Sequence, residues 1–363
     1  MTLLGADSSV VRDALDGGDA LPGTSGFAGE IDGHLVRDVL GRYPLYYERD
    51  DPATWQFRPT GLAEPVSLPG GAVHDTVEVH RAWKLPDPTP ALSDGRAVGR
   101  LKHALQTTID DVDTQNLAVA FSGGLDSALL AATVDVPLYT IGFPESHDLE
   151  AARTGATLLD RTVRVIELDH ALLKTAVPRV ARTIGRTNAM DVQIAVPLFL
   201  LAERVAEDGY DHLLLGQGAD ELFGGYAKIA RAPEDHRVAA ETVRGAQREV
   251  IQTLPSQLAR DWLAITEAGV DPSFPYLQDR VVRLALGLCD DQLVRDGIRK
   301  WTLRQAGTTW LPTELALREK KALQYGSLVA RELDRLARQA GFKRRMDDHI
   351  SRYVAHRCEA ENY

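Results

Sequence analysis

The chain has 363 residues, a formal net charge of −11, 44% hydrophobic residues and two cysteines. It holds no run near the ~20 apolar residues that a membrane-spanning helix needs, and no basic segment followed by an apolar core marks a signal peptide. Cys289 and Cys358 are isolated, which argues against a disulfide framework, a zinc site or thiolation chemistry. We therefore expect a cytoplasmic protein without a membrane partner.

The acidic balance arises from 33 Asp and 19 Glu against 33 Arg and only 8 Lys. A surface rich in Asp and poor in Lys retains hydration and counterions, as in the cytosol of a halophilic organism. A GC-rich genome also favours Arg over Lys and explains the counts equally well. Under either explanation we expect no broad basic surface and no nucleic-acid partner.

The first part of the chain predicts an antiparallel β region. Residues 1–25 are polar and rich in Gly and Asp, so we expect them to be irregular. Short alternating segments broken by Pro and Gly then follow at 27–31, 34–39, 45–48 and 77–83. The proline-rich stretch 85–90 is a stiff linker. We therefore place a domain boundary after residue 88, with one domain at 1–88 and a second at 89–363.

The second domain is predicted to be α/β, with a doubly wound parallel sheet. Apolar strand candidates alternate with helical segments, which is the pattern of such sheets. Beyond Tyr226 the chain is mostly helical, and the tail from Ser327 has an amphipathic helical pattern. The predicted strands are 117–121, 137–142, 163–168 and 212–216.

The most informative motif is F-S-G-G-L-D-S at 121–127, between an apolar run and a strong helix former. A Ser/Gly turn between a strand and a helix forms an anion site, because backbone N–H groups and the hydroxyls of Ser122 and Ser127 point at the oxyanion. The G-K-S/T ending of a Walker A loop is missing. An aspartate repels phosphate unless a cation lies between them, so Asp126 is predicted to bind magnesium.

A second acidic motif, G-Q-G-A-D-E-L-F-G-G-Y, stands at 216–226. The first motif resembles the pyrophosphate loop of PP-loop ATP pyrophosphatases, and the two together resemble the synthetase domain of the asparagine synthetase family. The resemblance covers residues from roughly 95 to 330. Further matching segments lie at 139–143, 148–152, 300–304 (K-W-T-L-R), 311–312 and 318–320.

The resemblance implies an ATP site and assigns roles within it. Asp126 and Asp220 would bind Mg²⁺ on either side of the pyrophosphate, and both follow parallel strands, where open α/β sheets place their ligands. Lys320 matches the active-site lysine of the family, a point charge that neutralises developing negative charge; its alternative role is a solvated residue in a basic run. The residues assigned to ATP or pyrophosphate are Phe121, Ser122, Gly123, Gly124, Asp126, Ser127, Ile141, Gly142, Leu215, Gly216 and Gln217.

The segment 35–47 is similar to a stretch late in the glutaminase domain of the same family. In such enzymes a cysteine at the mature N-terminus is the nucleophile, whereas Thr2 stands here and roughly half the usual domain length is missing. We therefore expect residues 1–88 to be a truncated, Ntn-type glutaminase-like β domain without amidase activity.

Three positions depart from the pattern of the family. Gln217 stands where Glu is usual, Gln193 where arginine is usual, and the segment 272–278 lacks its arginine. Gln cannot accept a proton at any useful pH. The stretch 320–327 resembles the divergent asparagine synthetase domain-containing proteins, which favours a divergent branch.

The leading hypothesis is an ATP-dependent, AMP- and pyrophosphate-forming amide ligase that acts through an acyl-adenylate. The reaction that we expect is aspartate to asparagine, with ammonia taken free or from a separate ammonia-supplying protein. A second hypothesis is adenylation of another carboxylate with an amine nucleophile, as in β-lactam synthetases. A third is a non-catalytic nucleotide-binding or partner-binding protein.

Overall fold

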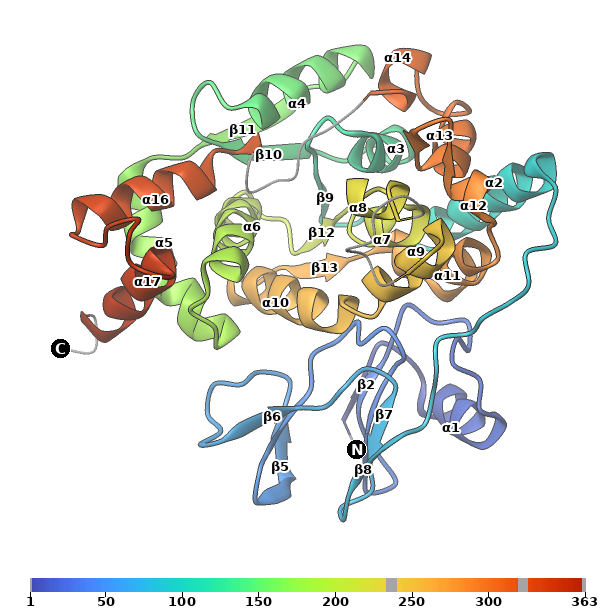
Figure 1. Cartoon of the computed structure of the whole chain (residues 1–363), viewed down its shortest axis with the longest axis horizontal. Helices are drawn as coiled ribbons and strands as arrows, with labels where there is room; N and C mark the ends of the chain where they lie inside the picture. Colours follow the sequence, from blue (N-terminus) through green and yellow to red (C-terminus); the bar gives the residue numbers. More distant parts are fainter. Residues whose placement is uncertain (1, 233–239, 319–325, 361–363) are drawn as a thin grey trace.

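The structure is a computed structural model of the chain that describes residues 2–232, 240–318 and 326–360. Figure 1 shows two layers: an antiparallel β region formed by the first part of the chain, and a larger region in which helices surround a sheet. The chain passes from the first to the second through a segment without regular structure before α2 (Asp94–Asp110). The boundary after residue 88 stays a prediction.

The larger region contains a five-stranded sheet in which every pairing is parallel, in the order β11-β10-β9-β12-β13. The central strand β9 is buried on both faces: Val119 packs in one core and Ala118 in the other. Burial on both faces explains the continuous apolar run. The α/β class predicted from the sequence is confirmed. The strands are β9 (Leu117–Ala120), β10 (Leu138–Gly142), β11 (Val163–Glu167), β12 (His212–Leu214) and β13 (Asp271–Ser273).

Helices bury both faces of this sheet and give the region two hydrophobic cores. The first core includes residues of α2, α3 (Leu125–Thr133), α4 (His147–Leu158), α7 (Ala219–Phe223), α9 (Val243–Ile251), α11 (Asp279–Leu286) and α13 (Trp301–Gly307). The second includes residues of α5 (His170–Ile184), α6 (Ala189–Glu207), α10 (Leu254–Glu267), α16 (Val329–Gln339) and α17 (His349–Ala360). Shorter elements are α8 (Ala227–Ala230), η1 (Pro275–Leu277), α12 (Asp290–Leu293), β14 (Val294–Arg295), β15 (Ile298–Arg299) and α14 (Thr313–Ala316).

The N-terminal layer consists of two antiparallel sheets, ordered β1-β2-β3-β7-β8 and β5-β4-β6. The prediction that residues 1–25 are irregular is wrong, because Leu3–Leu4 pairs with β2 and Ser8–Gly17 forms helix α1. In α1, Val11 and Ala14 are buried and Gly18 ends the helix at φ +66°. The strands are β1 (Leu3–Leu4), β2 (Ala28–Ile31), β3 (His34–Arg37), β4 (Tyr46–Glu48), β5 (Asp51–Gln56), β6 (Pro65–Ser67), β7 (Ala72–His74) and β8 (Val79–Arg81).

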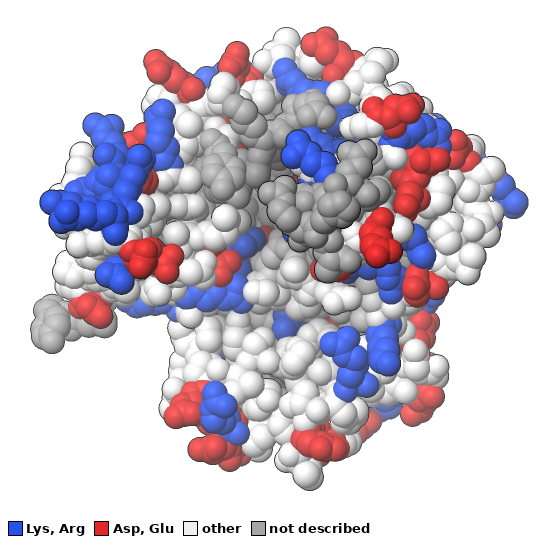
Figure 2. Space-filling model, in the orientation of Figure 1, with Lys and Arg blue, Asp and Glu red and all other residues white. Residues whose placement is uncertain are grey.

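The predicted helical tail is confirmed by α16 and α17. Lys and Arg side chains gather over α16 at the left of Figure 2. Arg331 and Arg344 are 65% and 70% exposed, whereas the acids that pair with them, Glu332 and Asp334, are 6% and 11% exposed. The local surface is therefore basic because the acidic partners lie beneath it. Among the described residues, no helix is long and apolar enough to cross a membrane.

Candidate active site

The phosphate-type loop is the first motif, residues 121–127, and it connects the end of β9 to the first turn of α3. Gly123 has φ +69°, and a Cβ there would overlap the backbone carbonyl of Ala151, so only glycine fits. Gly124 precedes the first turn of α3, with φ −85° and ψ 167°. This backbone leaves the first N–H groups of the helix facing the loop, an arrangement that suits an anion.

Two serine hydroxyls fix the loop from within. Ser127 Oγ accepts a hydrogen bond from Ser122 N at 3.1 Å and lies 3.0 Å from Ser122 Oγ. Ser127 Oγ also donates to the Gly124 carbonyl at 3.3 Å. The loop is therefore closed by its own side chains.

The second acidic motif forms a tight turn into α7. Gly218 has φ +89° and packs against Leu277, which leaves no room for a Cβ. Asp220 lies in the first turn of α7. At Gly225, a Cβ would overlap Oδ1 of Asp220, so the G-G-Y ending of the motif gives space to the aspartate.

Lys300 joins the two acidic motifs. Its Nζ lies 2.7 Å from both carboxylate oxygens of Asp126 and 2.7 Å from Oδ1 of Asp220. Burial opposes the charge on the amine, but the two carboxylates outweigh it and raise the pKa of Lys300. Lys300 has φ +58°, a conformation that non-glycine residues seldom adopt and that is often found at functional sites.

These elements surround a cavity of about 390 Å³, within the size range of small-molecule sites. The phosphate-type loop, the ends of β10 and β12, and residues of α6, α7 and α10 all contribute to its wall. The α6 residues are apolar: Ile194, Pro197, Leu198 and Leu201.

The α10 side of the cavity is polar. The buried Arg260 forms ion pairs with Asp261 at 2.8 Å and with Asp191 at 3.1 Å. The carboxylate of Asp261 also receives a long contact of 3.5 Å from Nε2 of Gln217. The side chain of Gln217 therefore extends from the second acidic motif toward α10.

Glu221 is a buried acid in the same wall. Burial raises its pKa, and the Tyr226 hydroxyl, which donates to Oε1 at 2.6 Å, partly opposes that rise.

Most of the residues predicted from the sequence meet in this cavity. Gly123 and Gly142 are in close contact with neighbouring atoms, and Gly124 precedes α3, but these three glycines are not among the lining residues. Lys320 lies outside the described residues. The predicted residues that line the cavity are Phe121, Ser122, Asp126, Ser127, Ile141, Leu215, Gly216, Gln217 and Asp220.

Of the three departures from the family pattern, Gln217 lines the cavity. Gln193 is buried in α6 and does not line it, although its neighbour Ile194 does. The segment 272–278 contributes none of the lining residues. The difference at Gln217 is therefore the one that bears directly on the cavity.

A family model described as asparagine synthase matches residues 100–268 and 234–357 of the chain. The chain belongs to the asparagine synthase family. A protein of Methanocaldococcus jannaschii, whose name describes it provisionally as a glutamine-hydrolysing asparagine synthetase, is 28% identical over 69% of the chain and 52% of its own length.

Other members show similar identity. Asparagine synthetase B (glutamine-hydrolysing) of Escherichia coli is 25% identical over 85% of the chain and 62% of its own length. Asparagine synthetase 3 (glutamine-hydrolysing) of Arabidopsis thaliana is 27% identical over 57% of the chain and 39% of its own length. The chain thus spans about half the length of the curated relatives it matches.

The sequence pattern did not reveal the place in the cavity of four residues that line it: Lys300, Glu221, Arg260 and Asp261. Lys300 carried a signal, since it begins the K-W-T-L-R segment that resembles the family. Arg260 and Asp261 lie in an ordinary amphipathic helix pattern, which gave no signal.

Proposed function

We propose that the protein is an ATP-dependent amide ligase that forms AMP and pyrophosphate through an acyl-adenylate, with aspartate as carboxylate and ammonia as nucleophile. The supporting observation is the convergence of Asp126 and Asp220 on Lys300 in one cavity beside a Ser/Gly loop at a helix start. An anion cradle flanked by two acids and a buried cation suits a polyphosphate.

In the first step, a carboxylate oxygen of the substrate attacks the α-phosphorus of ATP, and the bond from that phosphorus to the bridging oxygen breaks. The products are an acyl-adenylate and pyrophosphate. The loop 122–127 would bind the β- and γ-phosphates, and Phe121 and Ile141, both buried at strand ends, would contact the adenosine. The ammonium of Lys300 would stabilise the charge that builds up on the departing pyrophosphate.

In the second step, a neutral amine attacks the acyl carbonyl, the bond to AMP breaks, and one proton leaves the new amide nitrogen. The resemblance assigns charge neutralisation in this chemistry to Lys320, which remains part of the proposal. Gln217 would accept an N–H of the entering amine through its carboxamide oxygen, since its Nε2 faces Asp261.

The donor set suits magnesium. Asp126 and Asp220 supply carboxylate oxygens that already approach one point, occupied by the Lys300 ammonium. Mg²⁺ in nucleotide sites takes one or two carboxylates together with phosphate oxygens. Among the described residues no group of three or more His, Cys, Asp or Glu forms a cage, which agrees with such shared binding. A bound ion would neutralise phosphate charge.

The nitrogen would arrive as free ammonia or from a partner protein. The relatives that match are named as glutamine-hydrolysing, whereas we propose that the N-terminal β layer of this chain is a glutaminase-like remnant without amidase activity.

A second candidate is the same adenylation with an organic amine or another carboxylate. It is favoured by the neutral Gln217 and by the apolar α6 wall of Ile194, Pro197, Leu198 and Leu201. An apolar wall binds a carbon skeleton better than it binds ammonia.

The test is a substrate screen by pyrophosphate release, with Mg²⁺ and ATP, each amino acid in turn, and either ammonium or an organic amine. Equal amounts of AMP, pyrophosphate and asparagine would support the leading proposal. Turnover only with an organic amine or another carboxylate would support the second candidate. Tight ATP binding without any AMP formation would identify a non-catalytic nucleotide-binding protein.

A further inference from the structure

Two buried arginines of the N-terminal layer, Arg37 and Arg42, contact the larger region, and neither lines the cavity. We propose that Arg42 and Arg37 are positioning residues for the synthetase site. Arg42 holds η1, the turn that contacts the two acidic motifs proposed to bind ATP. Arg37 holds α10, whose residues Arg260 and Asp261 form the polar wall that we assign to the carboxylate substrate. This inference rests on the proposed function, because it names what sets the geometry of that same site. It gives the N-terminal layer a part in catalysis without any amidase activity.

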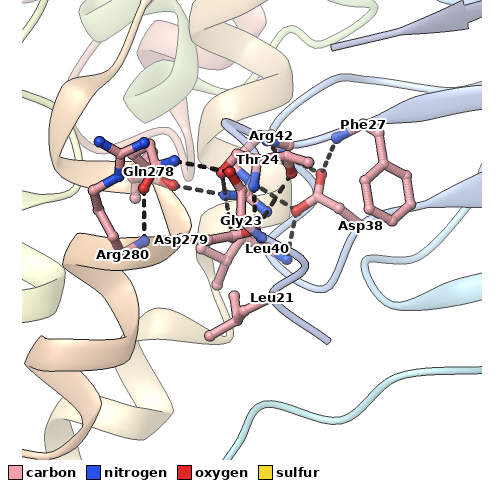
Figure 3. A network of polar contacts seen from close by, with 12 residues as sticks. Leu21, Gly23, Thr24, Phe27, Asp38, Leu40, Arg42, Gln278, Asp279 and Arg280 are labelled. Carbon is pink, nitrogen blue, oxygen red and sulfur yellow. Dashed lines mark hydrogen bonds and ion pairs between the residues drawn. The ribbon is translucent and has the colours of Figure 1, made fainter. Parts of the chain in front are cut away.

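Arg42 lies between two carboxylates, one from each layer (Figure 3). Its Nε is 2.9 Å from Asp38 Oδ1 and its Nη1 is 2.8 Å from Asp279 Oδ1. The same Nη1 donates to the backbone carbonyl of Leu277 at 2.7 Å. A guanidinium presents its donors in a fixed planar fork, so these bonds set where Leu277 and Asp279 lie relative to Asp38.

Asp279 makes a second connection to the N-terminal layer. Its Oδ2 accepts hydrogen bonds from the backbone N–H groups of Gly23 and Thr24 at 2.9 and 2.8 Å. Beside it, Gln278 Nε2 donates to the carbonyl of Gly23 at 3.0 Å. The start of α11 is therefore fixed to the N-terminal layer through Arg42 and through the backbone of Gly23 and Thr24 (Figure 3).

The turn η1, directly before α11, contacts the proposed ATP site. Tyr276 is fully buried, and its hydroxyl donates to the backbone carbonyl of Asp126 at 2.9 Å. Leu277 packs against Gly218 with no room for a Cβ between them. Asp126 and Gly218 stand at the starts of α3 and α7. The turn that Arg42 holds thus contacts both acidic motifs.

Arg37 makes the corresponding connection to α10. Its Nη2 donates to the carbonyls of Gly41 at 2.8 Å and Pro255 at 3.0 Å, and its Nη1 donates to the carbonyl of Leu68 at 2.7 Å. Pro255 is also in close contact with the same layer, since a Cβ on Gly41 or Gly70 would lie 2.7 or 2.8 Å from it. The first turn of α10 is therefore seated on the N-terminal layer.

The rest of α10 carries the polar wall of the cavity. Asp261 is six residues beyond Pro255, about 9 Å along the same helix at 1.5 Å per residue. A shift of Pro255 therefore moves Asp261, and with it the contact to Gln217. The two arginines act on different elements, so their replacement should change different constants.

The test compares Arg42→Lys and Arg37→Lys in the full chain. Lysine keeps the charge, so the buried acids stay compensated, but it loses the planar fork. The matched control is Arg12→Lys, in an exposed ion pair with Asp32 of the same layer. Measured quantities are the calorimetric Kd for ATP with Mg²⁺, the KM values for ATP and L-aspartate with ammonium, and the Tm.

We expect Arg42→Lys to weaken ATP binding about tenfold while the KM for L-aspartate stays at that of the control. We expect Arg37→Lys to raise the KM for L-aspartate about tenfold while the Kd for ATP stays at that of the control. Combining Arg42→Lys with Tyr276→Phe should cost less ATP affinity than the sum of the two single changes, because both act in part through the contact between Tyr276 and Asp126.

The proposal would be overturned if the Kd for ATP and the KM for L-aspartate of both variants equalled those of Arg12→Lys and only the Tm fell. It would also be overturned if each variant changed these two constants to the same extent. If the wild type forms no AMP with any substrate, the proposed function fails. The ATP affinity of Arg42→Lys, which needs no turnover, then decides this proposal by itself.

Discussion

Lys300 Nζ lies 2.7 Å from each carboxylate oxygen of Asp126, the residue that follows the Ser/Gly loop into α3. Oδ1 of Asp220 lies at the same distance from Nζ. Two acids and one base that are far apart in the sequence therefore form one compact charge cluster. A phosphate ligand or a cation that enters this cluster must rearrange these contacts.

The carboxylates are expected to be required for the first reaction step. Asp126→Asn and Asp220→Asn keep the shape but lose the charge that binds the cation, so we expect pyrophosphate release to fall about 100-fold or more. The control is Asp135→Asn, whose side chain is fully exposed. Full activity in either site variant would remove the proposed metal role.

Bound magnesium should partly compensate for the loss of the positive charge of Lys300. Lys300→Gln leaves two carboxylates around one point without compensation, which should lower the free energy of unfolding by about 3 kcal/mol. Added Mg²⁺ should then stabilise Lys300→Gln more than it stabilises the wild type, because the ion takes the place of the ammonium. Urea unfolding with and without MgCl₂ measures this difference. Equal stabilisation of both proteins would show that the ion binds elsewhere.

The absence of a side chain at Gly225 should be required for activity but not for the stability of the fold. A Cβ there would overlap Oδ1 of Asp220 and Cε of Lys300, which are ends of flexible side chains. We expect Gly225→Ala to reduce pyrophosphate release about 100-fold, while the free energy of unfolding stays within about 1 kcal/mol of the wild type. Gly99→Ala, in open space on α2, is the control and should leave activity unchanged.

The sequence predicted the parts of this molecule that depend on local pattern. Four parallel strands were found from apolar runs, whereas β13 was missed because its three residues, Asp271–Ser273, contain no such run. Helix α1 was missed because Gly and Asp around it indicated irregular chain, although its buried Val11 and Ala14 follow helical spacing.

The loops of the candidate site could also be predicted, since their glycines and acids are adjacent in the sequence. Lys300 could not be placed, because it reaches Asp126 through a left-handed turn and long-range packing. Arg42 and Asp279 were missed for the same reason: only the folded chain brings them to 2.8 Å. The halophilic origin stays a prediction.

Glu221 should give the stability a characteristic pH dependence. Burial raises its pKa above the ordinary 4.5, despite the hydrogen bond from Tyr226. The folded protein then holds this proton at pH values where the unfolded chain has lost it, so stability falls as the pH rises from the unfolded through the folded pKa. We expect the wild type to lose stability relative to Glu221→Gln over this range, measured by urea midpoints.

Tyr226→Phe supplies the control for this effect. It removes a donor that favours the carboxylate, so the folded pKa of Glu221 should rise further and the range over which stability falls should extend to higher pH. Parallel pH profiles for the wild type and Glu221→Gln would rule out a raised pKa at this position.

The last prediction concerns the nucleophile. If ammonia enters as neutral NH₃, amide formation by the wild type should rise with pH along the ammonium titration, because Gln217 cannot accept a proton. An organic amine that supports turnover, with no ammonia-dependent product at any pH, would favour the second candidate function.

Gln217→Glu should change this profile in two ways. A carboxylate here can act as a base and flatten the pH dependence, but it also brings a negative charge toward the polyphosphate and should raise the KM for ATP. It would also face Asp261, now 3.5 Å from the amide nitrogen, and the like charges should raise the pKa of the new acid. Gln217→Glu combined with Asp261→Asn relieves that repulsion, so its pH profile should flatten at lower pH than that of the single variant. Identical profiles for the single and double variants would mean that Asp261 does not act on position 217.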